Sequence, residues 1–303
     1  MKKILIVADF PHWIFNRHAN EIKNRLSNKY IIDIAYCRQN IAEKSKTYDC
    51  VYVMDPMPIQ YPDKNKTILG LRCEWLYKSH SSGAEGLYYK GILSGGVSIH
   101  DRCCLFHVVN KNQYKDFEPV VKDKPLLLVQ HGVNDKIFTT KFKNSGKFTV
   151  GISGRGKSNG RKGFDIIEKV CRNNNIELKI AEYNKPLSVQ DMPGFYHSVD
   201  VYVCFSDTEG LNNSSLESGA CGCAIISTRC GAAEQIINES NGILIDRNEI
   251  DLERALLMVQ EPNVLNTYKK NYNITILDGW TWDKRIEDFD KMFEIFFGLN
   301  INL

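Results

Sequence analysis

The sequence has 303 residues, of which 43% are hydrophobic and 25% charged, with a net charge of +3. This length and composition are typical of a soluble globular protein with about two domains. No apolar run approaches the ~20 residues that a membrane-spanning helix needs, and the run after Lys2 and Lys3 is too short for a signal peptide. Ten cysteines without a small-domain framework indicate a reducing, cytoplasmic environment.

Strands and helices alternate through the first half of the chain. Apolar runs rich in β-branched residues predict strands at 4–8, 30–36, 50–54, 67–71, 104–109 and 126–129. Residues 20–26 and 111–117 have the periodicity of helices. This alternation predicts an α/β domain with a parallel sheet and right-handed crossovers. The first strand is not followed by G-x-G-x-x-G, which disfavours a dinucleotide-binding dehydrogenase.

The same alternation continues in the second half. The predicted strands are 148–152, 177–181, 199–205, 224–228 and 242–245, and a helix is predicted at 164–171. The polar stretch 139–147 is typical of a linker between two domains. In the tail, residues 283–297 carry Ile286, Phe289, Phe293 and Phe296 at helical spacing, which predicts a helix that packs through one face.

Two glutamates, Glu209 and Glu217, flank a turn that contains Gly and Asn and leads into a predicted helix ending at Ala220. A helix N-terminus with free backbone amides favours an anion, most commonly a phosphate. Carboxylates on both sides of a phosphate site suit hydroxyl groups, so the pattern predicts a sugar-nucleotide site. The alternative is that Glu209 caps a turn and Glu217 is an exposed helix residue, which is common for two glutamates at this spacing.

The segments around this turn carry further motifs. They stand here as Gly151-Ile152-Ser153-Gly154-Arg155, Arg161-Lys162-Gly163, Met192-Pro193-Gly194-Phe195-Tyr196, Asp200-Val201-Tyr202-Val203, Ser206-Asp207-Thr208-Glu209-Gly210, Ser218-Gly219-Ala220-Cys221-Gly222, Gly231-Ala232-Ala233-Glu234 and Asn241-Gly242-Ile243-Leu244. Over residues 147–246, their order resembles the retaining glycosyltransferases of the family-4 type, which have the GT-B fold. Upstream, the segment 132–135 with Phe138 resembles the family's domain junction.

The resemblance implies an α/β chain with two Rossmann-like parallel-sheet domains that face a central cleft. Residues 1–140 would form the acceptor-binding domain, and residues 147–280 would form the nucleotide-sugar-binding domain. Residues 281–303 would form a helix that crosses back onto the N-terminal domain.

The resemblance also implies a retaining hexosyl- or pentosyltransferase that moves a sugar from a nucleotide-diphosphate sugar to an acceptor hydroxyl, without a metal ion or cofactor. Arg155 and Lys162 would neutralise the diphosphate. Glu209 would contact the donor sugar near the reacting face, and Glu217 would bind the ribose. The backbone of Gly210, Leu211, Asn212 and Asn213 at the turn would reach sugar hydroxyls and phosphate, and Glu182, Tyr183 and Met192 would lie around the base. The departing phosphate can take the acceptor proton, so no general base is assigned.

The acceptor is suggested only by charge. Residues 1–140 contain 20 Lys and Arg against 14 Asp and Glu. In the resembled family this part of the chain binds the acceptor, so the excess favours an acidic acceptor (a glycan, a lipid-linked sugar or a modified nucleic acid) or peripheral contact with the inner face of a membrane. A solvated basic face is the alternative.

Two other functions are compatible with the motifs. One is a sugar-nucleotide epimerase or hydrolase on the same scaffold, which would need acid and base residues that the sequence does not reveal. The other is a non-catalytic donor-binding subunit, which would have no need of Arg155, Lys162, Glu209 and Glu217 together.

Overall fold

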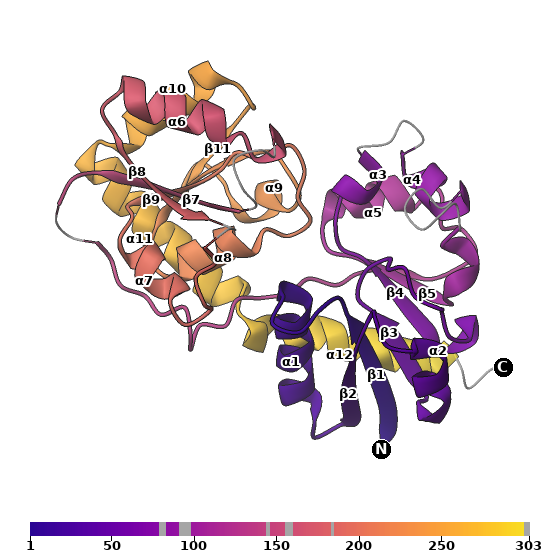
Figure 1. Cartoon of the computed structure of the whole chain (residues 1–303). Coiled ribbons are helices and arrows are strands. Elements are labelled where there is room, and N and C mark those ends of the chain that lie inside the picture. The colour runs from indigo at the N-terminus through magenta and orange to yellow at the C-terminus, as the bar shows by residue number, and fades with distance from the viewer. Residues whose placement is uncertain (79–82, 91–97, 144–145, 155–159, 183–184, 300–303) are drawn as a thin grey trace. The chain divides into compact units, whose positions relative to one another are not determined.

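The computed structural model describes residues 1–78, 83–90, 98–143, 146–154, 160–182 and 185–299. The chain forms two compact units: residues 1–131 together with the chain from residue 285 onward, and residues 132–284. Figure 1 shows parallel strands and covering helices in each unit. Among the helices of the described ranges, none combines the length and the apolar character needed to cross a lipid bilayer.

A six-stranded sheet with the strand order β2-β1-β3-β4-β5-β6 forms the centre of the N-terminal unit. Its strands are β1 (Lys2–Ala8), β2 (Tyr30–Tyr36), β3 (Cys50–Val53), β4 (Thr67–Leu71), β5 (Leu105–Val108) and β6 (Leu126–Leu128). Every neighbouring pair is parallel. All six predicted strands are confirmed, with ends that differ by two residues or fewer.

Short helices and turns connect these strands. They are α1 (Ile14–Leu26), α2 (Ile41–Lys44), η1 (Ser45–Thr47), η2 (Lys64–Lys66), α3 (Trp75–Lys78), α4 (Gly83–Glu85), η3 (Gly86–Lys90), η4 (His100–Arg102) and α5 (Lys111–Phe117). The predicted helix at 111–117 is confirmed. Helix α1 begins six residues before the predicted start, because its first buried side chain is His18, whose polar ring does not add to an apolar pattern.

The C-terminal helix α12 (Trp282–Leu299) contributes its aromatic face to the core of the N-terminal unit. The rings of Phe289 and Phe293 lie 6.4 and 6.2 Å from that of Tyr52 on β3. The hydroxyl of Tyr30 donates to Asp290 at 3.1 Å, and Lys29 forms an ion pair with the same carboxylate. These contacts hold the last helix to β2 and β3.

A five-stranded parallel sheet, ordered β11-β10-β9-β7-β8, forms the second unit. Its strands are β7 (Thr149–Gly154), β8 (Glu177–Glu182), β9 (Val201–Cys204), β10 (Ala224–Thr228) and β11 (Ile243–Ile245). Its helices are η5 (Gly160–Lys162), α6 (Phe164–Asn173), α7 (Met192–His197), α8 (Asn213–Ala220), α9 (Ala233–Ile236), α10 (Glu249–Val259) and α11 (Pro262–Gly279). Figure 1 shows α6 and α10 over one face of the sheet and α7, α8 and α11 over the other. Two covered faces explain why the strands read as continuous apolar runs.

The passage between the two units lies earlier in the chain than the sequence suggests. The second unit begins at Gly132, and part of the expected linker 139–147 is bound to it. Thr140 donates to the carbonyl of Ala220 at 3.1 Å, and Lys143 contacts the buried Asp200 at 2.6 Å. Polar composition suggested a linker here, but these polar groups have partners on the second unit.

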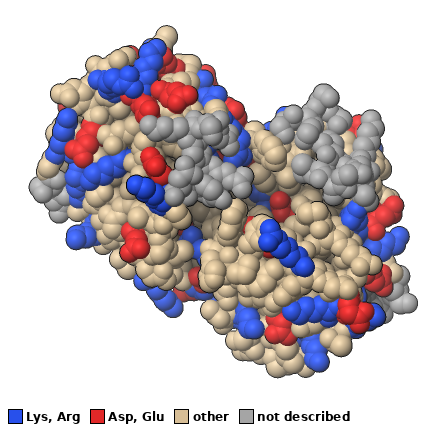
Figure 2. Space-filling view, in the orientation of Figure 1, with Lys and Arg blue, Asp and Glu red and all other residues tan. Residues whose placement is uncertain are grey.

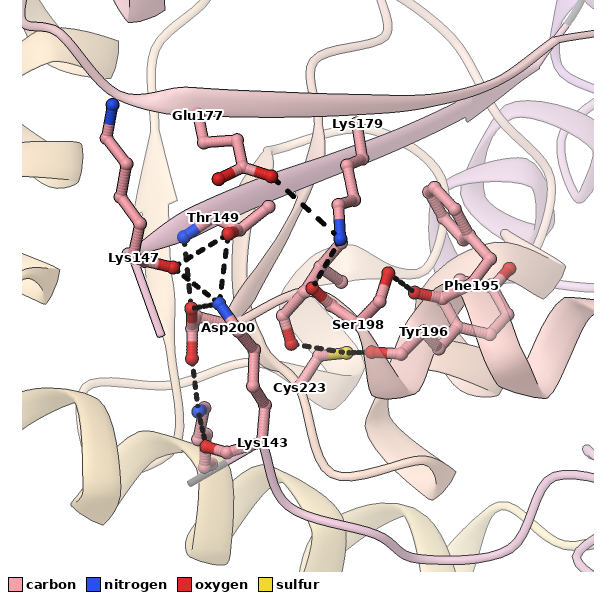
Figure 3. A network of polar contacts seen from close by, with 12 residues as sticks. Lys143, Lys147, Thr149, Glu177, Lys179, Phe195, Tyr196, Ser198, Asp200 and Cys223 are labelled. Atoms are coloured by element: carbon pink, nitrogen blue, oxygen red, sulfur yellow. Dashed lines mark hydrogen bonds and ion pairs between the residues drawn. The ribbon is translucent and has the colours of Figure 1, made fainter. Parts of the chain in front are cut away.

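Asp200 is the centre of a buried polar network, shown in Figure 3. Its carboxylate accepts from Lys143, from Lys269 at 2.7 Å and from the backbone amide of Thr149 at 3.0 Å. One anion therefore connects the start of β7, the segment before it and helix α11.

We predict that Asp200→Asn lowers the free energy of unfolding by about 3–5 kcal/mol, because two lysines then lose their counter-charge in a buried position. Urea unfolding of both proteins measures the difference. Glu177→Gln is the control, since the ion pair of Glu177 with Lys179 is 3.9 Å long and about 40% exposed, and we expect its effect to stay within about 0.5 kcal/mol. Equal effects of the two substitutions would contradict a structural role for the Asp200 network.

Candidate active site

A buried ion pair joins two of the residues predicted from the sequence. The ammonium nitrogen of Lys162, at the end of η5, lies 2.7 Å from Oε1 of Glu209, which follows β9. Ser206 donates to the same oxygen at 2.8 Å. Both charged side chains are about 15% exposed, so most of their contacts are with protein rather than water. The pair lies at the carboxyl edge of the second sheet, where ligands of parallel α/β folds bind.

Each member of this pair stabilises the charge of the other. Burial raises the pKa of Glu209, but the charge of Lys162 and the hydrogen bonds from Lys162 and Ser206 outweigh it, so the net pKa is lowered. Burial lowers the pKa of Lys162, but the charge and hydrogen bond of Glu209, together with Tyr202 and Cys204, outweigh it, so the net pKa is raised. Lys162 is therefore a cation and Glu209 an anion throughout the neutral range.

Two glycines allow the loops that carry this pair to approach closely. Gly163 has φ +63°, and a Cβ added there would lie 2.4 Å from the ring of Phe205. Gly231 has φ +56°, and its Cβ would lie 2.3 Å from the carbonyl oxygen of Gly210. Only glycine fits either position without a shift of the neighbouring chain. Gly163 therefore lets the turn after Lys162 pack against the end of β9. Gly231 lets the segment after β10 pack against the loop that contains Glu209.

Glu217 lies on α8 and is 5% exposed, so the alternative of an exposed helix residue is wrong. Its Oε2 accepts from the hydroxyl of Tyr196, on α7, at 2.9 Å. Beside this contact, the hydroxyl of Ser153 lies 2.8 Å from those of both Tyr202 and Ser214. A carboxylate and several hydroxyls therefore gather where β7 and β9 end and α8 begins. Such groups can exchange hydrogen bonds with the hydroxyls of a bound sugar.

The sequence predicts free backbone amides at the N-terminus of α8, and the structure differs from this in part. Asn212 caps the helix, and its side-chain oxygen accepts from the backbone N–H of Ser215 at 2.8 Å, so this amide already has a partner. Leu211 is 4% exposed and Gly210 is buried, so the side chain of Leu211 belongs to the core. Any ligand contact of these two residues would come from the backbone. Asn213 is half-buried.

The remaining predicted residues are scattered or outside the described ranges. Glu182 ends β8 at the border of the sheet and is exposed, and Met192 begins α7 and is half-buried. Arg155 and Tyr183 lie outside the described residues. The base and diphosphate contacts assigned to these four residues therefore stay predictions.

The sequence patterns missed two residues that shape the site. Ser206 binds Glu209 directly, and Arg247 joins the loops after β9 and before α6. The Nε of Arg247 lies 2.7 Å from Asp207 and donates to the carbonyl of Phe205 at 3.1 Å. Arg247 follows β11, and its position just after a predicted strand was the one sequence feature that could have indicated a place in the site.

The chain contains an Asp-x-Asp sequence, Asp288-Phe289-Asp290, of the kind that binds cations in another class of sugar transferases. In α12 the two carboxylates point in directions about 160° apart, on nearly opposite faces of the helix. Asp290 accepts from Tyr30 at 3.1 Å, and Asp288 lies 3.6 Å from Arg285. Over the described ranges, no group of three or more His, Cys, Asp and Glu side chains is arranged to hold a metal ion.

Comparison with known families and proteins supports the sequence motifs. Residues 141–261 match the family model "Glycosyl transferases group 1". An uncharacterized glycosyltransferase of Methanocaldococcus jannaschii is 30% identical over 99 residues, which cover 31% of this chain and 25% of the relative. The UDP-Gal:alpha-D-GlcNAc-diphosphoundecaprenol alpha-1,3-galactosyltransferase of Escherichia coli is 32% identical over 114 residues, 37% of this chain and 29% of the relative. The matched part of the chain thus spans less than a third of either relative.

Solved structures are similar over nearly the whole chain. A sucrose-phosphate synthase of Thermosynechococcus elongatus gives a TM-score of 0.74 at 12% identity, covering 99% of this chain and all of that one. The Anabaena protein HepE, in complex with UDP-glucose, gives 0.73 at 10% identity, covering 97% and 100%. The resemblance to glycosyltransferases of the GT-B fold is confirmed. At these identities the solved structures establish only the fold. The match to the family model of group 1 glycosyl transferases covers the segment that contains Lys162, Glu209 and Glu217.

We predict that Glu209→Gln lowers the free energy of unfolding by about 1–3 kcal/mol near pH 7, because Lys162 then stays buried without its counter-charge. The lowered pKa of Glu209 means that its contribution is present above the ordinary value of 4.5 and is lost as the pH falls below it. The difference between the two proteins should therefore shrink in acid. Urea unfolding at a series of pH values measures this, with Glu234→Gln, which alters the half-exposed pair with Arg229, as the control. A difference that is independent of pH would contradict the ion-pair assignment.

Proposed function

We propose that this chain is a retaining glycosyltransferase that moves a sugar from a nucleotide-diphosphate sugar to an acceptor hydroxyl without a metal ion. The observation that carries the proposal is the Lys162–Glu209 pair at the carboxyl edge of the second sheet, within the segment that matches group 1 glycosyl transferases. In this proposal the second unit binds the donor, and the first unit binds the acceptor.

Lys162 can serve the diphosphate while it stays bound to Glu209. An ammonium group has three N–H donors, and the hydrogen bond from Lys162 to Glu209 uses one of them. The other two can donate to diphosphate oxygens, and Arg155 would add a second cation. Because Glu209 fixes Lys162 in advance, its charge is in place when negative charge develops on the leaving group, which is how electrostatic preorganisation accelerates a reaction.

The acidic residues then hold the two sugars of the donor. Oε1 of Glu209 accepts hydrogen bonds from Lys162 and Ser206. The carboxylate can also accept a hydrogen bond from a hydroxyl of the transferred sugar. Glu217, fixed by Tyr196, would accept from the ribose hydroxyls. The bond between the anomeric carbon and the diphosphate oxygen breaks, a bond to the acceptor oxygen forms on the same face, and the acceptor proton passes to the departing phosphate.

The names of similar proteins suggest which substrates to test first. HepE has been solved with UDP-glucose, and the name of the E. coli relative states a UDP-galactose donor and a diphosphate-linked lipid acceptor. We propose a UDP-hexose donor and, among the acidic acceptors, a lipid-linked sugar, with the protein acting in the cytoplasm at the inner face of the membrane. On the face shown in Figure 2, basic and acidic side chains are interspersed, so the basic excess of residues 1–140 is not gathered into one area there. On this face, acceptor recognition would rest on individual groups rather than on a broad charged area.

We expect a UDP-hexose to raise the melting temperature of the wild-type protein, since a ligand at a hundredfold excess over Kd stabilises a fold by about 2.7 kcal/mol. Lys162→Ala and Glu217→Ala should lose the shift. Lys169→Ala is the matched control, because this lysine is 57% exposed and pairs with Glu249. Thermal-shift and calorimetric titrations with UDP-glucose, UDP-galactose and UDP-N-acetylglucosamine measure the effect. Variants that respond like the wild type would place the donor elsewhere.

For turnover, we expect Lys162→Ala to lower kcat by about 10²–10³-fold, the usual cost of losing one charge-stabilising donor. The assay follows UDP release with and without a lipid-linked sugar, in the presence of EDTA, and NMR of the product reports the anomeric configuration. Release of UDP without an acceptor would indicate a hydrolase, and an epimerised donor would indicate an epimerase. Donor binding without any turnover would indicate a binding subunit.

A further inference from the structure

The carboxyl edge of the N-terminal sheet holds a second group of buried polar side chains. Asp9 follows β1, Asp55 follows β3, Arg72 follows β4 and His131 comes after β6. All these strands are parallel, so their carboxyl ends share one edge of the sheet. This is the edge where open α/β sheets bind ligands. No local pattern indicates a common site, because these residues are far apart in the chain.

Arg72 is at the centre of this group. Its Nη2 lies 2.7 Å from Nδ1 of His18 and 3.0 Å from Nδ1 of His131. The aromatic ring of Phe15 lies against the guanidinium, 5.1 Å away. Arginine is only a donor, so both Nδ1 atoms must accept, and each imidazole is neutral with its proton on Nε2. The only positive charge among these three polar side chains is therefore that of Arg72.

This charge is buried and incompletely bonded. Arg72 is 6% exposed, and within the described residues its Nε and Nη1 have no hydrogen-bond partner of normal geometry. The two hydrogen bonds of Nη2 use two of the five guanidinium N–H groups, which leaves three. Buried donors without partners are costly, and buried charges are normally paired. Burial accordingly lowers the pKa of Arg72.

The nearby carboxylates attract the guanidinium electrostatically without a direct ion pair to it. Asp55 accepts from the backbone N–H of Arg72 at 2.8 Å, and within the described ranges neither Asp55 nor Asp9 forms an ion pair with its side chain. Burial raises the pKa of Asp55 to about 7, so this group is only partly ionised in the neutral range. Burial also raises the pKa of Asp9. The guanidinium, whose Nε and Nη1 have no partner of normal geometry, thus lies among two neutral imidazoles, the hydroxyl of Tyr52 and weakened acids.

We propose that Arg72, with His18 and His131, binds an oxyanion, a phosphate or a carboxylate, that belongs to the acceptor. The guanidinium supplies charge-assisted donors, which favour phosphate and carboxylate oxygens over neutral groups. The two histidines hold the guanidinium through their Nδ1 atoms. The assignment to the acceptor rests on the proposed function, because it requires that the second unit takes the donor.

A purely structural role for Arg72 leads to a different expectation. If Arg72 only tied α1 to the end of the sheet, its loss would break two hydrogen bonds and destabilise the fold. If its charge is held for a ligand, removal of the charge without loss of volume should leave the unliganded fold as stable as before, or more stable. Arg72→Met makes this change.

The experiment is a thermal-shift titration of the full chain with inorganic phosphate, pyrophosphate and succinate, at ionic strength held constant with sodium chloride. At about tenfold excess over Kd, we expect the wild type to gain roughly 2–4 °C in Tm. Arg72→Met should lose the gain with phosphate and with succinate, and Arg25→Gln, an arginine of α1 paired with Glu21, should keep it. Because the proposed donor site also takes a diphosphate, pyrophosphate is compared with succinate in the Lys162→Ala background. There a larger gain with pyrophosphate identifies a phosphate-bearing acceptor, and the reverse identifies a carboxylate.

The proposal is overturned if no oxyanion raises the Tm, if Arg72→Met responds like the wild type, or if Arg72→Met without ligand has a markedly lower Tm. Lys162→Ala separates this site from the donor site, because it should keep the phosphate response while it loses the response to UDP-sugars. If UDP-sugars fail to bind but the Arg72-dependent shift persists, the proposed function fails and the oxyanion site stands. If UDP-sugars bind but no Arg72-dependent shift occurs, only the oxyanion site fails.

Discussion

The common direction of the strands within each sheet is the constraint on which both sites depend. A strand buried on both faces must be apolar along its length, so the polar functional side chains lie on the residues just after it. In a parallel sheet those residues meet at one edge. Lys162, Glu209 and Arg247 gather in this way in the second unit, and Asp55 and Arg72 do so in the first.

The cations at the two sheet edges, Lys162 and Arg72, have different surroundings. Lys162 has Glu209 at 2.7 Å, and the pair keeps both groups charged and in place. Arg72 has two neutral imidazoles, and its neighbouring carboxylates are weakened by burial. A paired cation is stable without a ligand and still has donors to offer. An unpaired cation in the same kind of position carries a desolvation cost that a bound anion would relieve.

The elements that were predicted well are those with a purely local signal. Long apolar runs identified the strands, with 30–36 and 67–71 matching β2 and β4 at both ends. Helix α1 was shortened in the prediction because His18 is a buried polar residue. In the candidate site, the pairing of Lys162 with Glu209 could not be foreseen, since the two are 47 positions apart and nothing local couples them. The backbone contact of Leu211 with the donor stays a prediction, and packing places the side chain of Leu211 in the core.

The sequence by itself determined the α/β class, the order of strands and helices, and the resemblance of residues 147–246 to glycosyltransferases, because these depend on patterns within short stretches of chain. The tertiary structure alone decided that Glu217 is buried against Tyr196 and that Arg72 meets His18 and His131. Each of these contacts joins side chains whose environment is set by packing. Burial and the choice of partner also set the charge state of a side chain, and no local pattern contains that information.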